Sequence, residues 1–452
     1  MLYDTVLKCL DWRYSAAIVG LVKYFNFSNE QYDKIEYEQD EESISFRQED
    51  ISMERYLAFV EDYYKDDMYH KKVEEQLFYS DFDENAIKLV NEWLAGNTVM
   101  KKVFGKLKFD GSNKEIILKT IEDNRQMIIR ETFRNKKNLY SNFCNKMLLG
   151  EQEQPHCRLV GYNIDEGRKS KSTAYLFDNS LFVGNDRMEF DFIPFAFTNT
   201  YDAFFINNNI DIQTLCHTNR DMQRKVKENK AQSNAMEILF QEIMTSSDFL
   251  DYDVEIIVKS RDKEFFGTLY IRKSAIEKLR KLKTLKGINF SVKITDDYYI
   301  RIGNEVIHCI LNDLKVDSLI YFLLKEEEKR KGGEFSYNYA IQRLIGVNQI
   351  IKEEEVMTDQ MKMAYGKAIE CTNNLMSDNK KNKIKSYKQK LISAMVAEDY
   401  DRVNMLLLHL SEFSNTSFAF IYDLFEDFES NKEIALTFIH KFGEQEEKEK
   451  EK

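Results

Sequence analysis

Residues 11–25 of the chain read DWRYSAAIVGLVKYF, and apolar side chains in and before this stretch recur three or four positions apart. That spacing places them on one face of an α-helix, which is then buried against the rest of the fold. Gly20 has no side chain, so a neighbouring element can approach the helix closely there. We therefore predict a helix over residues 1–35 with a buried face formed by Leu7, Leu10, Tyr14, Ala17, Ile18 and Leu21.

The chain has 452 residues, of which 43% are hydrophobic and 13% are aromatic. This length predicts two or three folding units of roughly 100–200 residues each, with enough apolar side chains to fill their cores. Residues 1–150 have mainly helical spacing. Residues 151–335 mix helices with short aromatic and β-branched runs, and turn pairs such as Asp178-Asn179 and Gly184-Asn185 predict strands within 175–197 and again within 253–311.

A charge run followed by Gly332-Gly333 predicts a boundary near residue 335. Beyond it the spacing is helical, with helices expected near 336–356, 359–376, 380–397, 399–411, 416–428 and 431–442. Residues 443–452 contain no strongly apolar side chain and are expected to form a disordered charged tail. The predicted fold class is α+β: a mixed helix and sheet body over residues 1–335, followed by an all-α bundle over residues 336–442.

No segment approaches 18 consecutive apolar residues, and Lys8, Asp11 and Lys23 interrupt the apolar N-terminal stretch. We expect neither a signal peptide nor a membrane span, and therefore a cytoplasmic protein. The six cysteines show no framework spacing in a chain of this length, so free thiols are expected.

The net charge of -12 hides a segregation of charge along the chain. Residues 36–67 are acidic, whereas residues 101–137 hold eleven basic side chains against five acidic ones. Two further basic stripes lie at residues 272–286 and 380–390. Each stripe alone is equally compatible with a solvated lysine-rich surface, but the three together favour a track for a phosphate backbone.

Two adjacent Cys/His pairs are the candidates for a metal site. His156-Cys157 and Cys216-His217 are poor zinc ligands, because neighbouring side chains diverge from one another. We therefore predict no metal site and no cofactor.

Neither a nucleotide-binding motif nor a nuclease motif is complete. The segment GRKSKST at 167–173 lacks the second glycine of a P-loop, and we interpret it as a basic loop near a phosphodiester. A nuclease needs carboxylates that converge from separate elements. In residues 251–260, however, the alternation of polar and apolar side chains places the carboxylates on one solvent-facing side of a single predicted strand. We therefore predict no catalytic residue; the carboxylates and lysine concerned are Asp251, Asp253, Glu255 and Lys259.

The segment Asp11–Phe25 resembles the N-terminal helix of the large-subunit family of type I-B and I-A CRISPR interference complexes, in which an aromatic residue, small residues and a glycine-hydrophobic pair recur. The order of the parts is similar too, because an acidic second segment, a central α/β region and a C-terminal bundle resembling the small subunit follow one another. Many relatives carry central CxxC pairs that bind zinc, and this chain has none.

The resemblance implies a non-catalytic large subunit of a type I-B surveillance complex, Cascade, near the 5′ handle of the guide RNA. Its implied partners are the CRISPR guide RNA, double-stranded target DNA, the other backbone subunits, the small subunit and the helicase-nuclease that it recruits. It would read the protospacer-adjacent motif (PAM) and aid formation of the R-loop, while guide pairing supplies sequence specificity.

Asparagine and lysine can contact base edges while flanking cations hold phosphates. The candidate DNA-binding residues are Asn97, Lys101, Lys102, Lys106, Lys108, Asn113, Arg130, Arg134, Lys136 and Lys137. The candidates for an RNA or DNA backbone are Arg168, Lys169, Lys171, Arg272, Lys273, Lys278, Arg280, Lys281, Lys283, Lys286, Lys380, Lys381, Lys383, Lys385 and Lys388.

Residues 352–357 can be encoded by a purine-rich tract just before an ATG, and type I-B relatives produce their small subunit by internal initiation. Met357 is therefore a candidate internal start for a 96-residue product, although an ordinary acidic helix face explains the same residues. Two other functions stay open for the whole chain. One is a degenerate metal-dependent nuclease or RNA-processing defence enzyme, and the other is a scaffold that binds only protein.

Overall fold

The computed structural model describes residues 3–32, 34–78, 82–136, 138–144, 148–150, 157–160, 186–198, 200–208, 210–229, 235–246, 249–329, 335–378 and 380–444. The chain divides into two compact units. The N-terminal unit comprises Met1–Phe240 and Asp253–Ile271, and the C-terminal unit comprises Gln241–Tyr252 and Arg272–Lys452. Helices and small antiparallel sheets make up the described residues, which confirms the predicted α+β class.

The division into units differs from the division expected from the sequence. Residues 272–335, assigned above to the N-terminal body, group with the C-terminal helices. A bundle that folds independently from residue 336 therefore stays a prediction. None of the helices in the described ranges is long and apolar enough to cross a lipid bilayer.

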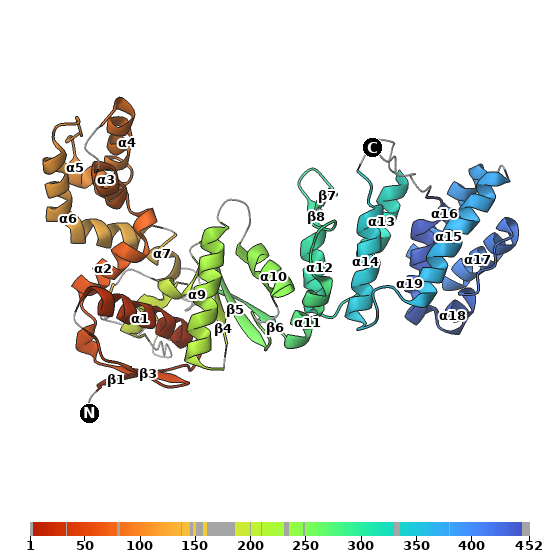
Figure 1. Cartoon of the computed structure of the whole chain (residues 1–452), viewed down its shortest axis with the longest axis horizontal. Coiled ribbons are helices and arrows are strands. Elements are labelled where there is room, and N and C mark those ends of the chain that lie inside the picture. Colours follow the sequence, from red (N-terminus) through yellow and green to blue (C-terminus); the bar gives the residue numbers. More distant parts are fainter. Residues whose placement is uncertain are drawn as a thin grey trace, which may run out of the picture. The chain divides into compact units, whose positions relative to one another are not determined.

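The N-terminal unit contains two three-stranded antiparallel sheets, ordered β1-β3-β2 and β4-β5-β6. Figure 1 shows α3 to α6 gathered together within this unit. Its described elements are β1 (Thr5–Lys8), α1 (Trp12–Gln31), β2 (Glu38–Gln39), β3 (Ser43–Phe46), η1 (Gln48–Asp50), α2 (Met53–Tyr63), η2 (Lys65–Asp67), α3 (Tyr69–Phe78), α4 (Glu84–Leu94), α5 (Thr98–Phe104), α6 (Lys114–Asn135), α7 (Tyr140–Phe143), η5 (Met188–Phe192), α8 (Ile193–Ala196), β4 (Asp202–Asn207), α9 (Ile212–Glu228), β5 (Val254–Ser260) and β6 (Gly267–Ile271), with α10 (Ala235–Thr245) divided between the units.

The predicted first helix is right in its centre and wrong at its ends. Residues before Trp12 form β1, which pairs with β3 at Val6↔Ser45. The helix begins only after Asp11, whose carboxylate caps it by accepting a hydrogen bond from Arg13 N at 2.8 Å. Leu10, predicted to be buried, is 69% exposed because it lies in the turn between the strand and the helix.

Two segments predicted to be strands are helical. Residues 188–196 form η5 and α8, and Pro194 lies in the first turn of α8, where its missing N–H costs no hydrogen bond. Ile302, Val306 and Ile310 are buried at four-residue spacing on α12, so the apolar run is a helix rather than a strand and turn. Residues 175–185 lie outside the described residues.

Helix α1 is buried around most of its circumference and packs against η5 and α8. The closest approach is at Gly20, where a Cβ atom would lie 2.0 Å from the carbonyl oxygen of Phe192. No side chain fits between the two backbones, so this position requires glycine, as the sequence predicted.

Side chains of α1, α2 and α9 satisfy the carbonyl groups of the η5–α8 segment. The hydroxyls of Tyr56 and Tyr64 donate to the carbonyl oxygens of Asp191 and Pro194 at 2.8 and 2.9 Å. Lys23 Nζ donates to Phe195 O at 2.8 Å, and burial lowers the pKa of this lysine to about 7. These bonds allow an irregular backbone segment to lie inside a hydrophobic core.

The C-terminal unit is mainly helical and contains one described β-hairpin. The helices after residue 336 agree closely with the predicted ranges. Its elements are α11 (Lys273–Leu282), β7 (Ser291–Lys293), β8 (Tyr299–Arg301), α12 (Ile302–Leu311), α13 (Asp317–Lys329), α14 (Asn338–Ile351), α15 (Asp359–Ser377), α16 (Lys381–Val396), α17 (Tyr400–Ser414), α18 (Ile421–Glu426) and α19 (Phe428–Lys441).

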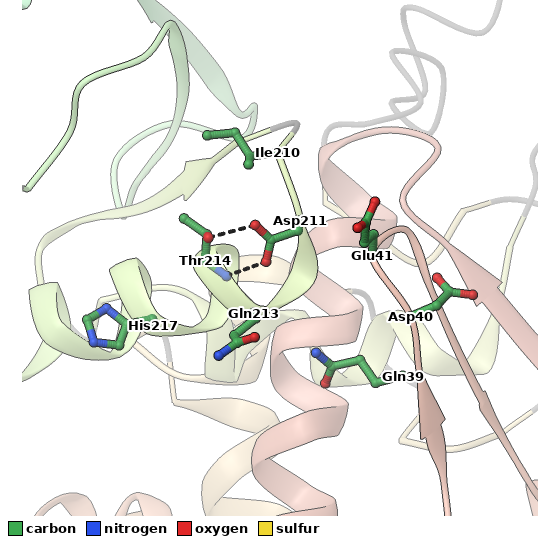
Figure 2. Close-up of a pocket in the computed structure, with 8 residues that line it drawn as sticks. All are labelled: Gln39, Asp40, Glu41, Ile210, Asp211, Gln213, Thr214 and His217. Carbon is green, nitrogen blue, oxygen red and sulfur yellow. Dashed lines mark hydrogen bonds between the residues drawn. The ribbon is translucent and has the colours of Figure 1, made fainter.

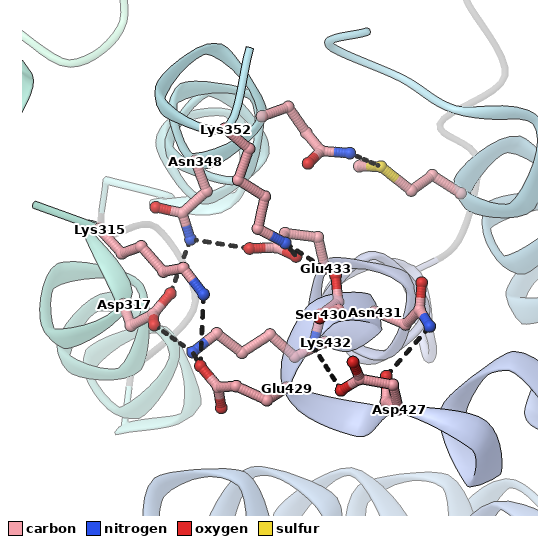
Figure 3. A network of polar contacts seen from close by, with 12 residues as sticks. Lys315, Asp317, Asn348, Lys352, Asp427, Glu429, Ser430, Asn431, Lys432 and Glu433 are labelled. Carbon is pink, nitrogen blue, oxygen red and sulfur yellow. Dashed lines mark hydrogen bonds and ion pairs between the residues drawn. The ribbon is translucent and has the colours of Figure 1, made fainter. Parts of the chain in front are cut away.

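A polar network joins α13, α14 and α19 (Figure 3). Lys432, 4% exposed, pairs with Asp317 and with Glu429 at 2.7 Å. Asn348 donates to Asp317 and, at 3.3 Å, to Glu433, which also pairs with Lys352. Because Asp317 precedes the predicted boundary and its partners follow it, the network ties the two sides of that boundary into one unit.

Replacing Gly20 by alanine is expected to lower the free energy of unfolding by about 1–3 kcal/mol, because the added methyl group collides with the backbone of Phe192. Gly366→Ala is the matched control. It adds the same atom to a helix where nothing lies within 4 Å, and is expected to stabilise the chain by roughly 0.5–1 kcal/mol. Urea denaturation followed by circular dichroism measures both; equal effects of the two substitutions would contradict the close packing at Gly20.

The network also predicts a dependence of stability on pH. Burial alone raises the pKa of Glu429, but hydrogen bonds from Lys432, Tyr400 and Lys315 outweigh it and lower this pKa to about 2. A depressed carboxyl pKa stabilises the fold above the ordinary value of 4.5, and this contribution is lost as the pH falls toward about 2.

Glu429→Gln is therefore expected to lose less stability than the wild type on acidification over this range, as measured by thermal unfolding at several pH values. Glu426→Gln, which removes an exposed carboxylate without an ion pair among the described residues, is the control. The same acid dependence in wild type and Glu429→Gln would contradict the assignment.

Candidate nucleic-acid interface

The first predicted basic stripe forms helix α5, a loop over residues 105–113 and helix α6. Asn97 caps α5 by accepting a hydrogen bond from Met100 N at 2.7 Å. The helix ends at Gly105, whose φ of +54° turns the chain out of the helix.

The side chain of Asn91 on α4 holds this loop in place. Its amide nitrogen donates to Phe109 O at 2.8 Å, and its carbonyl oxygen accepts from Phe109 N at 2.9 Å. The Phe109 ring is 2% exposed and packs edge-on against Phe82, with the ring centroids 5.0 Å apart. Lys108 therefore directly precedes a residue whose backbone N–H and C=O groups are both hydrogen-bonded to Asn91.

Local hydrogen bonds occupy the polar side chains of the same loop. Asp110 accepts hydrogen bonds from the backbone and hydroxyl of Ser112, which lowers the pKa of its carboxyl group. Asn113 donates to Lys108 O at 2.8 Å. Asn97 and Asn113, predicted to contact base edges, are thus engaged in local hydrogen bonds in this conformation: Asn97 caps α5, and Asn113 holds the loop.

Most cations of this stripe have no carboxylate partner within 4.0 Å among the described residues. We call these side chains the α5–α6 basic surface. All of them except the half-buried Lys114 are exposed, so their positive charge faces solvent. They are Lys101, Lys102, Lys106, Lys108, Lys114, Lys119 and Arg130.

The remaining cations of the stripe are engaged in ion pairs or lie outside the described residues. Arg125 pairs with Glu61, Glu74 and Glu122, and these carboxylates outweigh burial and raise its pKa. Lys136 pairs with Asp67 at 2.7 Å, and Arg134 lies 3.7 Å from Glu131. Lys137 lies outside the described residues.

The second stripe, residues 272–286, is divided between structural and exposed cations. Lys278 is 6% exposed and pairs with Asp313 at 2.6 Å and Glu353 at 3.4 Å. Arg280 donates to the carbonyl oxygen of Leu250. Exposed side chains on the surface of the same segment are Arg272, Lys273, Lys281, Lys283 and Lys286.

The third stripe, residues 380–390, lies beside carboxylates. Lys380 pairs with Asp378 at 3.1 Å, and burial lowers the pKa of Lys388, which donates to His440 O at 3.1 Å. A cavity of about 770 Å³ has basic and acidic residues in its lining. The basic ones are Lys381, Lys385 and Lys388, the acidic ones are Glu327, Glu328 and Glu444, and Lys383 is exposed.

The first stripe belongs to the N-terminal unit and the other two belong to the C-terminal unit. A single groove through all three therefore stays a prediction. The basic loop with Arg168, Lys169 and Lys171 lies outside the described residues.

The N-terminal unit also has an acidic hollow of about 830 Å³, between the turn after β2 and the start of α9 (Figure 2). Asp211 caps α9 by accepting hydrogen bonds from Thr214 N and Oγ1, at 2.8 and 2.7 Å. Asp40 is held similarly by Ser43, and these bonds lower the pKa of both carboxyl groups. The hollow is anionic and disfavours phosphate groups.

Two of the four residues considered for a nuclease site are hydrogen-bonded to neighbouring side chains. Asp253 accepts a hydrogen bond from Tyr270 at 2.8 Å, and Glu255 accepts one from Asn207 at 2.8 Å. Lys259, predicted to face solvent, is instead 2% exposed, and its ammonium donates to Asn142 Oδ1 at 3.3 Å and to Ser260 O at 3.0 Å.

No group of three His, Cys, Asp or Glu side chains in the described part of the chain is placed to hold a metal ion. Of the two Cys/His pairs, Cys157 is 1% exposed, the side chain of His217 is 65% exposed, and His156 lies outside the described residues. All six cysteines are free thiols, as predicted. The absence of catalysis stays an expectation.

A buried ion network was missed by the sequence analysis. Arg158, 2% exposed, pairs with Asp186 at 2.9 Å and with Asp191 at 2.7 Å. Burial raises the pKa of Asp191 to about 6, so it is still an anion at neutral pH. Tyr140 donates to the same carboxylate at 2.6 Å. Nothing in the local spacing of these distant residues indicates that they meet.

Met357 lies between α14 and α15. A product beginning there keeps α15 to α19 but lacks α13 and α14, and with them Lys352 and Asn348, which bind the buried Glu433. Internal initiation itself stays a prediction.

The comparison with protein families gives a match that covers most of the chain. The family model of CRISPR-associated protein Csx8 matches residues 3–236 and 222–442. No curated protein and no solved structure matches the chain. The matched segments span most of the chain and both of its compact units. The chain therefore belongs to the CRISPR-associated protein Csx8 family and is a CRISPR-associated defence protein.

Proposed function

We propose that this chain is the non-catalytic large subunit of a type I-B, RNA-guided surveillance complex. It binds guide RNA and duplex target DNA, reads the protospacer-adjacent motif, aids R-loop formation and recruits the helicase-nuclease. Its other partners are the backbone subunits and the small subunit of the complex. Membership of a CRISPR-associated family supports the setting, and the α5–α6 basic surface supports the binding of a polyanion.

The observation that carries this proposal is the lack of carboxylate partners for the lysines of the α5–α6 basic surface among the described residues. The chain is acidic overall, with a net charge of -12, so carboxylates are not scarce. Arg125, which lies on α6 like part of this surface, forms ion pairs with three carboxylates. Lysines without a carboxylate partner stay available to phosphates, and their binding releases the counterions condensed on the nucleic acid.

Phosphate contact by this surface makes a quantitative prediction. In the full chain, the triple substitution Lys101→Ala, Lys106→Ala and Lys108→Ala is expected to weaken binding to mixed-sequence duplex DNA. The slope of log affinity against log salt becomes shallower by about one per lysine. Fluorescence anisotropy at several salt concentrations measures this slope.

The matched control removes the same number of positive charges elsewhere in the N-terminal unit, by Lys8→Ala, Lys34→Ala and Lys263→Ala. This variant is expected to keep a slope close to that of the wild type. Identical slopes for the two triple variants would reject the α5–α6 basic surface as the duplex-binding site.

Asn91→Ala tests whether the loop must be held in place. This substitution keeps every lysine but removes both hydrogen bonds to Phe109. The affinity is expected to fall a few-fold because the loop must be ordered on binding, while the salt slope stays at the wild-type value because the phosphate contacts are the same. A changed slope with unchanged circular dichroism would show that Asn91 acts in another way.

A further inference from the structure

A group of aromatic side chains lies at the surface of the C-terminal unit, beside the start of α14. Phe335 and Tyr339 are 65% and 57% exposed. Phe335 contacts the half-buried rings of Phe290 and Tyr337, with centroid distances of 5.5 and 5.6 Å. Phe290 and Tyr337 are stacked on one another at 5.8 Å. The exposed ring of Phe335 thus packs against two other aromatic rings.

The loop that connects α11 to β7 supports Tyr339. Gly287 lies directly beneath the tyrosine ring, since a Cβ atom there would fall 2.0 Å from Tyr339 Cε1. Gly287 also has φ +85°, a conformation that a side chain disfavours. Arg343 on α14 donates to Thr284 O of the same loop at 2.5 Å. The helix and the loop are therefore fixed to one another before any ligand binds.

The same loop and the end of α11 carry exposed cations beside the rings. Lys281, Lys283 and Lys286 are exposed, and none has a carboxylate within 4.0 Å in the described ranges. Lys286 directly precedes the glycine that touches the Tyr339 ring. Within this part of the second stripe, positive charge and aromatic surface occur together.

A small cavity adjoins this surface. It has a volume of about 200 Å³, and its lining includes Lys281, Tyr339 and Arg343. His440 also lines it and is 4% exposed, and its Nδ1 has no hydrogen-bond partner among the described residues. Burial lowers the pKa of His440 to about 3, so the ring is neutral at physiological pH. Apolar side chains such as Ile345, Ile350 and Met361 also line the cavity, so His440, whose Nδ1 atom lacks a hydrogen-bond partner among the described residues, lines a mainly apolar space.

We propose that this aromatic-cation surface binds single-stranded nucleic acid, with unpaired bases stacked on Tyr339 and Phe335. The backbone phosphates lie against Lys281, Lys283 and Lys286. The inference rests on the proposed function and assigns a single-strand site to the C-terminal unit, separate in residues from the duplex-binding α5–α6 basic surface.

Two physical arguments select an unpaired strand as the occupant. Aromatic side chains stack on the faces of bases, which a duplex keeps inside its own stack, so exposed rings favour single strands. Unpaired lysines beside the rings complement phosphates, whereas lysine is depleted where a protein partner buries an aromatic patch.

The test uses the full chain with single-stranded DNA and RNA of mixed sequence, each carrying 2-aminopurine as a stacking probe. Tyr339→Ala and Phe335→Ala are each expected to weaken single-strand binding roughly 5-fold or more and to reduce the quenching of the probe. Tyr339→Phe is expected to bind like the wild type, because the ring is kept. The DNA and RNA arms show which strand this surface prefers.

Tyr422→Ala is the matched control, since Tyr422 is 79% exposed on α18 of the same unit. Binding of duplex DNA is expected to stay unchanged in both aromatic variants, and circular dichroism checks that they fold. Wild-type single-strand affinity in Tyr339→Ala and Phe335→Ala, or an equal loss in Tyr422→Ala, overturns this inference while leaving duplex binding intact. Failure of the wild type to bind any nucleic acid overturns the proposed function as well.

Discussion

The N-terminal unit depends on the contact between the backbone of α1 at Gly20 and the backbone of Phe192. This approach brings the irregular η5–α8 segment into the centre of the core, where water cannot reach its carbonyl groups. Tyrosines of α2, Lys23 of α1 and Gln223 of α9 supply the missing donors. The close packing and the hydrogen bonds thus require each other, since an unpaired buried carbonyl is costly.

The electrostatic character of the chain follows from how its cations are held. Arg125 and Lys278 are surrounded by carboxylates, so their charges contribute to the fold and little to the outside field. The loop with Lys106 and Lys108 is instead fixed by the neutral amide of Asn91 and by the buried ring of Phe109. An acidic chain can in this way present a cationic surface without neutralising it.

The C-terminal unit shows why a boundary read from composition differs from a boundary in space. Gly332-Gly333 and the charge run before it have the composition of a linker. Asp317, which precedes the glycine pair, nevertheless binds Lys432 and Asn348, which follow it. Charged groups buried this way are held by partners on other helices, because an isolated buried charge is strongly unfavourable. The helices on both sides of the glycine pair are therefore parts of one unit.

The sequence by itself determined the elements whose signals are local. The apolar spacing predicted the centre of the first helix and the helices after residue 336, and Gly20 marked the close approach. Asp11 and Asn97 are helix caps, but only the structure shows where each helix begins, because a capping residue looks like any other polar residue in the sequence.

Only the tertiary structure decided which chemical groups meet. It placed Asn91 against Phe109, Tyr339 over Gly287, and Arg158 between Asp186 and Asp191. The residues of these pairs lie 18 to 52 positions apart in the sequence. It also separated the cations of each stripe into paired and exposed ones. Periodicity reports which face of an element is buried, but it carries no information on which distant partner covers that face, since many packings satisfy the same pattern.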